Sequence, residues 1–251
     1  MTQDPARFVP AFYSARGSGD SRWSDWWVLL HPPYTLWLLS YVAIGACLAP
    51  HVDGGRLTAT LIAFGLAVGV SAHALDELHG RPLRTAIPRG LLVFAAATSL
   101  VGAVVIGIVG IFRVGIGLVV FIVIGVVLVV VYSLELFGGR LHNNVVFAAA
   151  WGAFPVLAAY FAQAETIGFP AVAAAIGAYA LSTAQRSLST PVRALRRSVV
   201  AVDGTVTYGN GRTSALTVDA LRVPLETALK AIAFGMVAMA VALIVFRFTV
   251  R

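Results

Sequence analysis

The chain has 251 residues, of which 59% are hydrophobic and 12% are charged, and its formal net charge at pH 7 is +7. In soluble domains about a quarter of all residues are charged, so this composition excludes an ordinary soluble enzyme and predicts an integral membrane protein. The positive charge is explained by the basic residues that membrane proteins carry on their cytoplasmic side, and nucleic acid is not needed to account for it.

Seven apolar stretches are long enough to cross a bilayer as helices. A hydrocarbon core of about 30 Å requires roughly 20 apolar residues per helix. These stretches are continuous and rich in Ala, Leu and Gly, whereas the strands of a membrane barrel alternate at period two. The sequence therefore predicts a single all-α membrane domain over residues 1–251, with about seven spans near residues 27–49, 57–79, 88–111, 114–134, 144–163, 168–188 and 226–247.

The distribution of basic residues predicts the orientation of these helices. If the N-terminus is cytoplasmic, fourteen of the 18 Lys and Arg residues fall on the inner side, beginning with Arg7 and Arg16. Cytoplasmic loops of membrane proteins carry an excess of Lys and Arg. We therefore expect a bacterial or archaeal plasma-membrane protein with its site on the cytoplasmic face. The remaining four basic residues fall on the outer side; they are Arg56, Arg113, Arg247 and Arg251.

A cluster of ionisable residues closes the second predicted span, in "AHALDELHGRPL" (72–83). If the helix continues to Gly80, His73, Asp76 and Glu77 are spaced i, i+3 and i+4 and share one face. Ionisable residues in a membrane helix are costly, and they usually face the bundle interior, pair or bind a ligand. Two carboxylates followed by arginines suit Mg²⁺ bridged to a phosphate. An ion-pair network among these acids and arginines is the structural alternative.

Residues 189–225 form the longest predicted loop, on the inner side. It contains two turn signals, Asp203-Gly204 and Asn210-Gly211. An Asp-Gly turn permits the positive φ angles of a type I′ turn, so we expect a small hairpin in "SVVAVDGTVTY". A short amphipathic helix is expected next, in "TVDALRVPLETALK". The loop would either cover the cytoplasmic mouth or lie on the headgroups as a connector.

Three segments resemble the UbiA-type prenyltransferase superfamily. They are "HPPYTLW" at the first span, "AHALDELHGRPL" closing the second, and "VVYSLELFGGRLHNNVVFAAAWGAFPVLAAYFAQ" from the end of the fourth span through the fifth. The first acidic motif of that family is NDxxDxxxD followed by an Arg-Pro-Leu element, and "RPLRT" at residues 81–85 is the nearest local match. The resemblance covers roughly residues 30–190.

The chain departs from the family pattern in both of its acidic motifs. In the first, Asp76 occupies an aspartate position, while Ala72, His73 and Gly80 stand where the family has Asn, Asp and Asp; Glu77 could supply a displaced carboxylate. The second motif, DxxxD after the sixth span, is absent from "STAQRSLSTPVRALRR". The family has eight or nine helices, whereas this sequence predicts seven.

The resemblance implies a membrane transferase that displaces the diphosphate of a polyprenyl substrate with the help of Mg²⁺. It implies that Asp76 and Glu77 are catalytic metal ligands, with His73 beside them. Guanidinium groups bind phosphate bidentately without a metal, and the expected phosphate-binding residues are Arg81, Arg84, Arg140, Arg186 and Arg193. The alternative is a catalytically degenerate scaffold of the same kind, which binds lipid or a protein partner without turnover.

Other classes of membrane protein agree less well with the sequence. The single lysine, Lys230, lies in the first turn of the last span and not mid-membrane, where a retinal Schiff base would need it. Five histidines are fewer than a membrane di-iron desaturase needs. A zinc site from His73, Asp76 and His79 would require the helix to break, since residues six apart lie about 120° out of register. The paired broken helices of a transporter are not visible.

Overall fold

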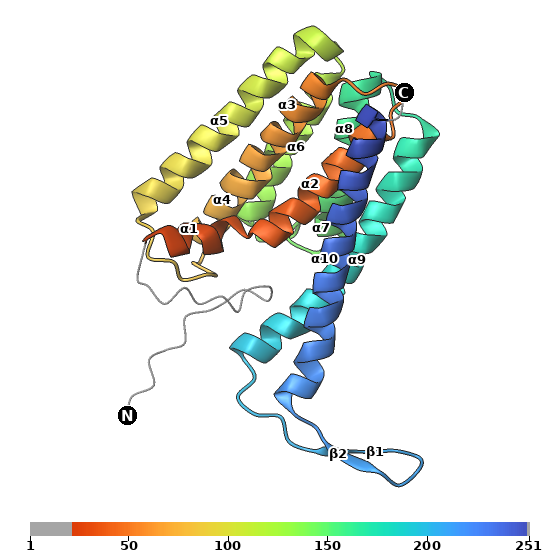
Figure 1. Cartoon of the computed structure of the whole chain (residues 1–251). Helices are drawn as coiled ribbons and strands as arrows, with labels where there is room; N and C mark the ends of the chain where they lie inside the picture. Colours follow the sequence, from red (N-terminus) through yellow and green to blue (C-terminus); the bar gives the residue numbers. More distant parts are fainter. Residues whose placement is uncertain (1–21, 250–251) are drawn as a thin grey trace.

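The computed structural model describes residues 22–249, and nearly all of its regular structure is helical (Figure 1). The prediction of an all-α chain is confirmed. Arg7, Arg16 and Arg251, which entered the argument about orientation, lie outside the described residues. In chain order the elements are α1 (Arg22–Leu30), α2 (Pro32–Cys47), α3 (Gly54–Phe64), η1 (Gly65–Ala72), α4 (His73–Leu78), α5 (Arg89–Val114), α6 (Leu118–Ser133), α7 (Asn144–Ala148), η2 (Ala149–Ala153), α8 (Phe154–Ala164), α9 (Phe169–Arg197), β1 (Thr205–Thr207), β2 (Thr213–Ala215) and α10 (Val218–Thr249).

Within residues 22–249, five helical segments are long and apolar enough to cross a membrane. They are Trp23–Cys47, Gly54–Leu78, Arg89–Val114, Asn144–Ala164 and Val218–Thr249. The other two predicted spans correspond to α6, which is apolar but has 16 residues, and to α9, which has 29 residues and four arginines in its second half. Five of the seven predicted spans therefore have the length and composition of membrane-crossing helices.

Two of these segments contain π-helical turns that the sequence analysis did not predict. The π-helix η1 joins α3 to α4, and η2 joins α7 to α8. Pro155 comes two residues after the last residue of η2 and has no N–H to donate, so the wider turns before it accommodate the missing hydrogen bond. π-helical turns are often found at functional sites, and both of these contribute side chains to the cavities described below.

The first predicted span is broken at His31, whose φ is 43°. The next helix begins with two prolines, which are favourable in a first helical turn because the N–H groups there have no partner within the helix. The break lets α1 run across the end of α4 and the start of α5 (Figure 1). Leu29 of α1 is fully buried there against Leu83 and Leu92. This arrangement covers one side of the bundle at the end where α4 finishes.

Helix α2 lies at the centre of the bundle and packs most extensively against α8 and α10. Its buried face includes Trp37 and Tyr41, which contact Val156 of α8 and Met236 of α10. Gly45 permits the close approach of the two backbones, because a Cβ atom there would lie 2.8 Å from Val156 Cα. Small residues at helix crossings are the usual means by which membrane helices pack closely.

Polar contacts gather the predicted outer-side arginines at one end of the bundle. The Arg56 guanidinium pairs with Glu165 at 3.0 Å and also donates to the Arg113 carbonyl. Arg247 donates to the carbonyl of Cys47 at 2.7 Å. These three arginines belong to the group that the sequence assigned to the outer side. The structure therefore confirms that they share an end of the bundle.

The connection between the last two helices differs from the prediction. Helix α9 runs on to Arg197 and α10 begins at Val218, so much of the predicted loop 189–225 is helical and both helices extend beyond the bundle (Figure 1). The expected amphipathic helix is the first part of α10, continuous with the last span. Arg196 pairs with Glu226 at 2.6 Å and ties the two extensions together.

The hairpin forms around the second turn signal and not the first. Strands β1 and β2 pair antiparallel with Thr207 opposite Thr213, which places Asn210-Gly211 in the turn. Gly211 has φ 78°, and the Asn210 side chain accepts a hydrogen bond from the Arg212 N–H at 3.1 Å. Gly204, in the expected turn, instead directly precedes β1. The side-chain hydrogen bond of Asn210 stabilises the turn that forms.

The close approach at Gly45 generates a prediction for stability. Gly45→Ala should destabilise the protein by about 1–3 kcal/mol, because the added methyl group meets the backbone of α8 and not a side chain that can move. Thermal unfolding in detergent measures the effect. Gly177→Ala in α9 is the matched control, since a Cβ atom there meets nothing within 4 Å. Equal melting temperatures for the two variants would contradict the packing described.

Candidate functional site

A pocket of about 380 Å³, called the polar pocket below, lies at the end of the bundle where α4 and α6 finish. Helices α2, α4, α6, α7 and α9 and both π-helices contribute to its wall. Four of the five histidines of the chain line it. Its polar lining residues are His31, Tyr34, His73, Asp76, Glu77, His79, Tyr132, Ser133, Glu135, His142, Gln185, Arg186, Ser189, Arg193 and Arg197.

Arginines from one face of α9 form a cationic wall of this pocket. Arg186, Arg193 and Arg197 are spaced by seven and four residues, which places them on the same side of a helix. Buried Gln185 and Ser189 lie on this side of the helix and line the same pocket. The face forms because α9 continues through Pro191 and does not end before it.

The arginines are positioned by neutral groups. Arg186 donates through Nε to the Asn144 side-chain oxygen at 3.0 Å and lies 4.8 Å over the Phe147 ring. Arg193 donates to the Ser189 hydroxyl at 3.2 Å. Neither arginine forms an ion pair with a residue in the range 22–249. Two guanidinium charges therefore face the pocket without a carboxylate to neutralise them.

The electrostatic surroundings of Arg193 disfavour its own charge. Burial lowers the pKa of the Arg193 guanidinium, and the like charges of Arg186 and Arg197 lower it further. An arginine side chain nevertheless stays protonated at neutral pH. An anion bound among these groups would relieve their mutual repulsion, so the wall favours a ligand with more than one negative charge.

Acidic groups lie on the opposite side of the pocket. Glu135 lies 3.8 Å from His79 and 3.7 Å from His142, and all three side chains are partly exposed at the rim. Asp76, on α4, is partly buried and forms no ion pair with any residue that the structure describes. Of the two predicted carboxylate ligands, Asp76 is therefore the one that remains available in the pocket.

Three buried polar atoms in the wall have no hydrogen-bond partner within residues 22–249. They are the Tyr132 and Ser133 hydroxyls and the Gln185 side-chain oxygen, on residues that are 5%, 2% and 6% exposed. A buried polar group without a partner costs about 1–3 kcal/mol. Such atoms usually have a ligand, ion or water as partner. The pocket is therefore built to receive polar groups from outside the chain.

Glu77 has a structural role in the loop that follows α4. Its side chain is fully buried, and its two oxygens accept hydrogen bonds from the Leu83 N–H at 2.9 Å and from the Thr85 N–H at 2.8 Å. The Thr85 hydroxyl donates a third, at 2.9 Å. Both carboxylate oxygens are thus engaged by the chain itself. The displaced metal ligand expected at this position is a loop-stabilising residue in the structure.

Three of the five expected phosphate-binding arginines lie outside the polar pocket. Arg81 donates to the carbonyls of Thr85 at 2.9 Å and Ile87 at 2.8 Å, so it braces the same loop as Glu77. Arg84 and Arg140 are exposed. The structure brings Arg186 and Arg193 into the pocket, and it adds Arg197 to them.

The described residues do not form a complete metal site by themselves. No group of three or more His, Cys, Asp or Glu side chains within residues 22–249 is arranged to hold a metal ion. The expected Mg²⁺ ligands, His73, Asp76 and Glu77, therefore do not form such a group. The residues of the zinc hypothesis, His73, Asp76 and His79, do not form one either. The helix does end before His79, as the zinc hypothesis required, but the side chains do not converge.

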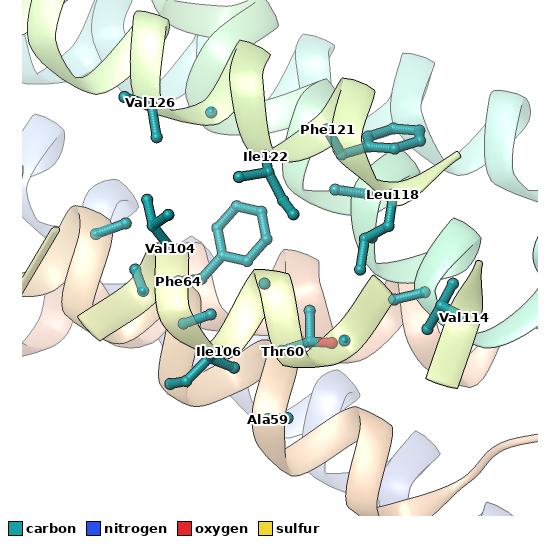
Figure 2. A pocket seen from close by; sticks show the side chains of 18 of the residues that line it. Ala59, Thr60, Phe64, Val104, Ile106, Val114, Leu118, Phe121, Ile122 and Val126 are labelled. Carbon is teal, nitrogen blue, oxygen red and sulfur yellow. The ribbon is translucent and has the colours of Figure 1, made fainter. Parts of the chain in front are cut away.

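An apolar cleft of about 650 Å³ lies between α3, α5, α6 and α8 (Figure 2). Figure 2 shows Ile122 of α6 pointing toward the Phe64 ring and Leu118 of α6 pointing into the cleft to the right of that ring, and Thr60 is the one labelled residue with a polar atom. Val105 of α5 lines the cleft and is half-exposed.

The apolar cleft and the polar pocket adjoin each other. Val68 of η1 and Trp151 of η2 line both. Trp151 packs edge-on against Tyr132 of the pocket wall, with ring centroids 5.6 Å apart. A molecule with an anionic end and an apolar chain could place its two parts on either side of these residues.

Comparisons with known proteins give no match to this chain among family models, curated proteins or solved structures. The candidate site is therefore argued from its own residues. The likeness to the UbiA-type superfamily is based on the sequence segments quoted above.

Sequence reasoning identified Arg186 and Arg193 but missed that α9 continues and brings Ser189 and Arg197 to the same face. Residues 186, 189, 193 and 197 recur at helical spacing in "QRSLSTPVRALRR", and that period was the available signal. Pro191 and the polarity of this segment favoured a loop instead. Tyr34, Tyr132 and Gln185 carried no signal in the sequence, because they come together only when three helices pack.

The role of Glu77 predicts a loss of stability on removing its charge. In Glu77→Gln an NH₂ group replaces one carboxylate oxygen, and it faces a backbone N–H of the loop in either orientation of the amide. Each polar group that loses its hydrogen-bond partner in this way destabilises the protein by about 1–3 kcal/mol. The melting temperature should fall, and amide hydrogen exchange at Leu83 and Thr85 should accelerate. Glu165→Gln is the control, because exposed ion pairs contribute about 0–1 kcal/mol. Unchanged exchange at the loop in Glu77→Gln would contradict this role.

Proposed function

We propose that the protein is an integral membrane, UbiA-like prenyltransferase that acts on a polyprenyl phosphate or diphosphate. The observation that carries this proposal is the junction of the two cavities at Val68 and Trp151, with unneutralised arginines on one side and an apolar cleft on the other. A polyprenyl diphosphate has the same division, with charge at one end and hydrocarbon along the rest.

The polar pocket supports the anionic part of this substrate. Guanidinium groups bind phosphate oxygens in a bidentate manner, and Arg186 and Arg193 have no competing carboxylate among the described residues. The Tyr132 hydroxyl can donate a hydrogen bond to a further phosphate oxygen. The arginines thus neutralise charge on the side where the second acidic motif of the family is absent.

The apolar cleft supports the hydrocarbon part. It is larger than the polar pocket, and its labelled lining is almost wholly aliphatic and aromatic (Figure 2). Burial of apolar chain in such a cleft contributes about 0.8 kcal/mol per CH₂ group when the chain comes from water. A substrate that already resides in the bilayer would enter from the side, past α5.

We propose that Mg²⁺ binds to the polar pocket together with the substrate. Mg²⁺ commonly takes one or two protein carboxylates and completes its octahedron with phosphate oxygens and water. Asp76 is the carboxylate that the pocket offers, because both oxygens of Glu77 are already engaged. When bound, the ion would neutralise charge on the leaving diphosphate.

The orientation in the membrane is part of the same proposal. We infer that α6 and the first part of α9 also cross the bilayer, which gives seven spans with the N-terminus in the cytoplasm. The positive-inside rule supports this orientation, because fourteen of the 18 Lys and Arg residues, among them Arg186, Arg193 and Arg197, fall on the cytoplasmic side, and Arg56, Arg113 and Arg247 fall on the other. The polar pocket would then open toward the cytoplasm.

A non-catalytic lipid-binding protein on the same scaffold is the second candidate. The structural role of Glu77 favours it, because one of the two acids expected to perform chemistry is used to hold a loop. This candidate predicts binding without dependence on a divalent cation.

Binding of geranylgeranyl diphosphate to the purified protein in detergent separates the two candidates. We expect binding to weaken at least about tenfold when Mg²⁺ is chelated, and Asp76→Asn to remove this dependence, because a carboxylate ligand is lost. Asp203→Asn, on the exposed connection before β1, is the matched control and should bind as the wild type does. Binding that is unaffected by chelation would favour the non-catalytic candidate.

The arginine wall generates a second binding prediction. Arg193→Gln should weaken binding of geranylgeranyl diphosphate about tenfold or more, because hydrogen bonds to charged groups contribute about 1.5–3 kcal/mol. Arg140→Gln should leave the affinity unchanged, since Arg140 is exposed outside the pocket. Isothermal titration or a filter-binding assay measures both. Equal losses in the two variants would indicate long-range electrostatic attraction and not a specific contact.

A further inference from the structure

His73 is held in a defined orientation in the wall of the polar pocket. It is the first residue of α4 and is 9% exposed. Its Nδ1 atom lies 3.0 Å from the carbonyl oxygen of Gly69, which belongs to the π-helix η1. A carbonyl oxygen can only accept a hydrogen bond, so this contact requires that Nδ1 carries the hydrogen.

The hydrogen on Nδ1 determines what the other ring nitrogen can do. In a neutral imidazole that is protonated at Nδ1, Nε2 has an unshared electron pair and no hydrogen. No residue within 22–249 forms a hydrogen bond with His73 Nε2. The ring lines the polar pocket, with the His31 ring 5.4 Å away and the Tyr34 ring 6.1 Å away.

Two other histidines of the pocket lie beside a carboxylate. His79 and His142 are at the rim, 3.8 Å and 3.7 Å from Glu135, and the Nδ1 atom of His142 also lies 3.3 Å from the Tyr132 carbonyl oxygen. His73 has no carboxylate within ion-pair distance among the described residues. A buried imidazole with Nδ1 fixed by a backbone carbonyl has the arrangement of a general base that acts through Nε2.

We propose that His73 accepts, at Nε2, the proton of the nucleophile that attacks the prenyl carbon. This inference depends on the proposed function, and it assigns the acceptor to the class of nucleophiles that lose a proton from O–H. The acceptor oxygen forms a bond to C1 of the prenyl group, and its proton moves to Nε2. The bond from C1 to the diphosphate oxygen breaks, and its electron pair leaves with the diphosphate. The imidazolium then returns the proton to solvent.

The tautomer of His73 can be measured without a substrate. In protein labelled with ¹⁵N-histidine, the nitrogen chemical shifts distinguish protonated from unprotonated ring nitrogens, and the His73 signals are those missing from His73→Asn. We expect Nδ1 to be protonated and Nε2 unprotonated at neutral pH. A proton on Nε2 would overturn the proposal.

Turnover provides the functional test, with water as the O–H nucleophile and geranylgeranyl diphosphate as the probe. His73→Asn keeps a side-chain N–H that can donate to the Gly69 carbonyl but removes Nε2. Release of diphosphate should fall about 10²-fold or more, the usual contribution of a general base, while binding of the probe is retained. His51→Asn is the control, since His51 is exposed outside the pocket and should leave the rate unchanged.

The outcomes separate this inference from the proposed function. Failure of the wild type to bind the probe would refute the proposed function itself. Binding with equal diphosphate release in the wild type and His73→Asn would overturn the role of His73 alone. Binding without any release by the wild type would overturn it as well, because a base that acts on water should produce measurable hydrolysis.

Discussion

The hydrogen bonds of the Glu77 carboxylate organise the end of the bundle that contains the polar pocket. A charge in an apolar interior must be satisfied by donors, and Glu77 takes them from the loop that follows its own helix. This fixes where α4 ends and places Leu83, a lining residue of the polar pocket. The preceding residue, Asp76, projects from the helix in a different direction and reaches the pocket.

The opposite wall shows the reverse situation, because no carboxylate among residues 22–249 forms an ion pair with Arg186 or Arg193. Arg186 and Arg193 are held by neutral oxygen atoms of Asn144 and Ser189, which orient the guanidinium groups without neutralising them. Together with the unpartnered Tyr132 hydroxyl and Gln185 oxygen, they form a surface whose polar groups are complementary to an anion. A bundle can remain stable with such a surface where hydrogen bonds to a bound ligand offset the free-energy cost of the unpaired polar groups.

The π-helices connect these polar features to the hydrocarbon side. Val68 and Trp151, from η1 and η2, separate the polar pocket from the apolar cleft, and Gly69 of η1 fixes the ring of His73. In a regular α-helix the carbonyls and side chains at these positions would have a different register. Local departures from α-helical geometry thus position both the junction of the two cavities and the ring of His73.

The sequence by itself determined the helical class, most of the segments that are long and apolar enough to cross a membrane, and the separation of charge between two ends, because these depend on composition and on periods along the chain. It also located Asp76, Arg186 and Arg193 as candidates. Only the tertiary structure decided that Glu77 and Arg81 hold a loop, that α9 continues through Pro191 and adds Arg197, and that Tyr132 and Gln185 complete the pocket. Those roles depend on which groups from distant segments meet, and the pattern within one segment carries no information about its partners.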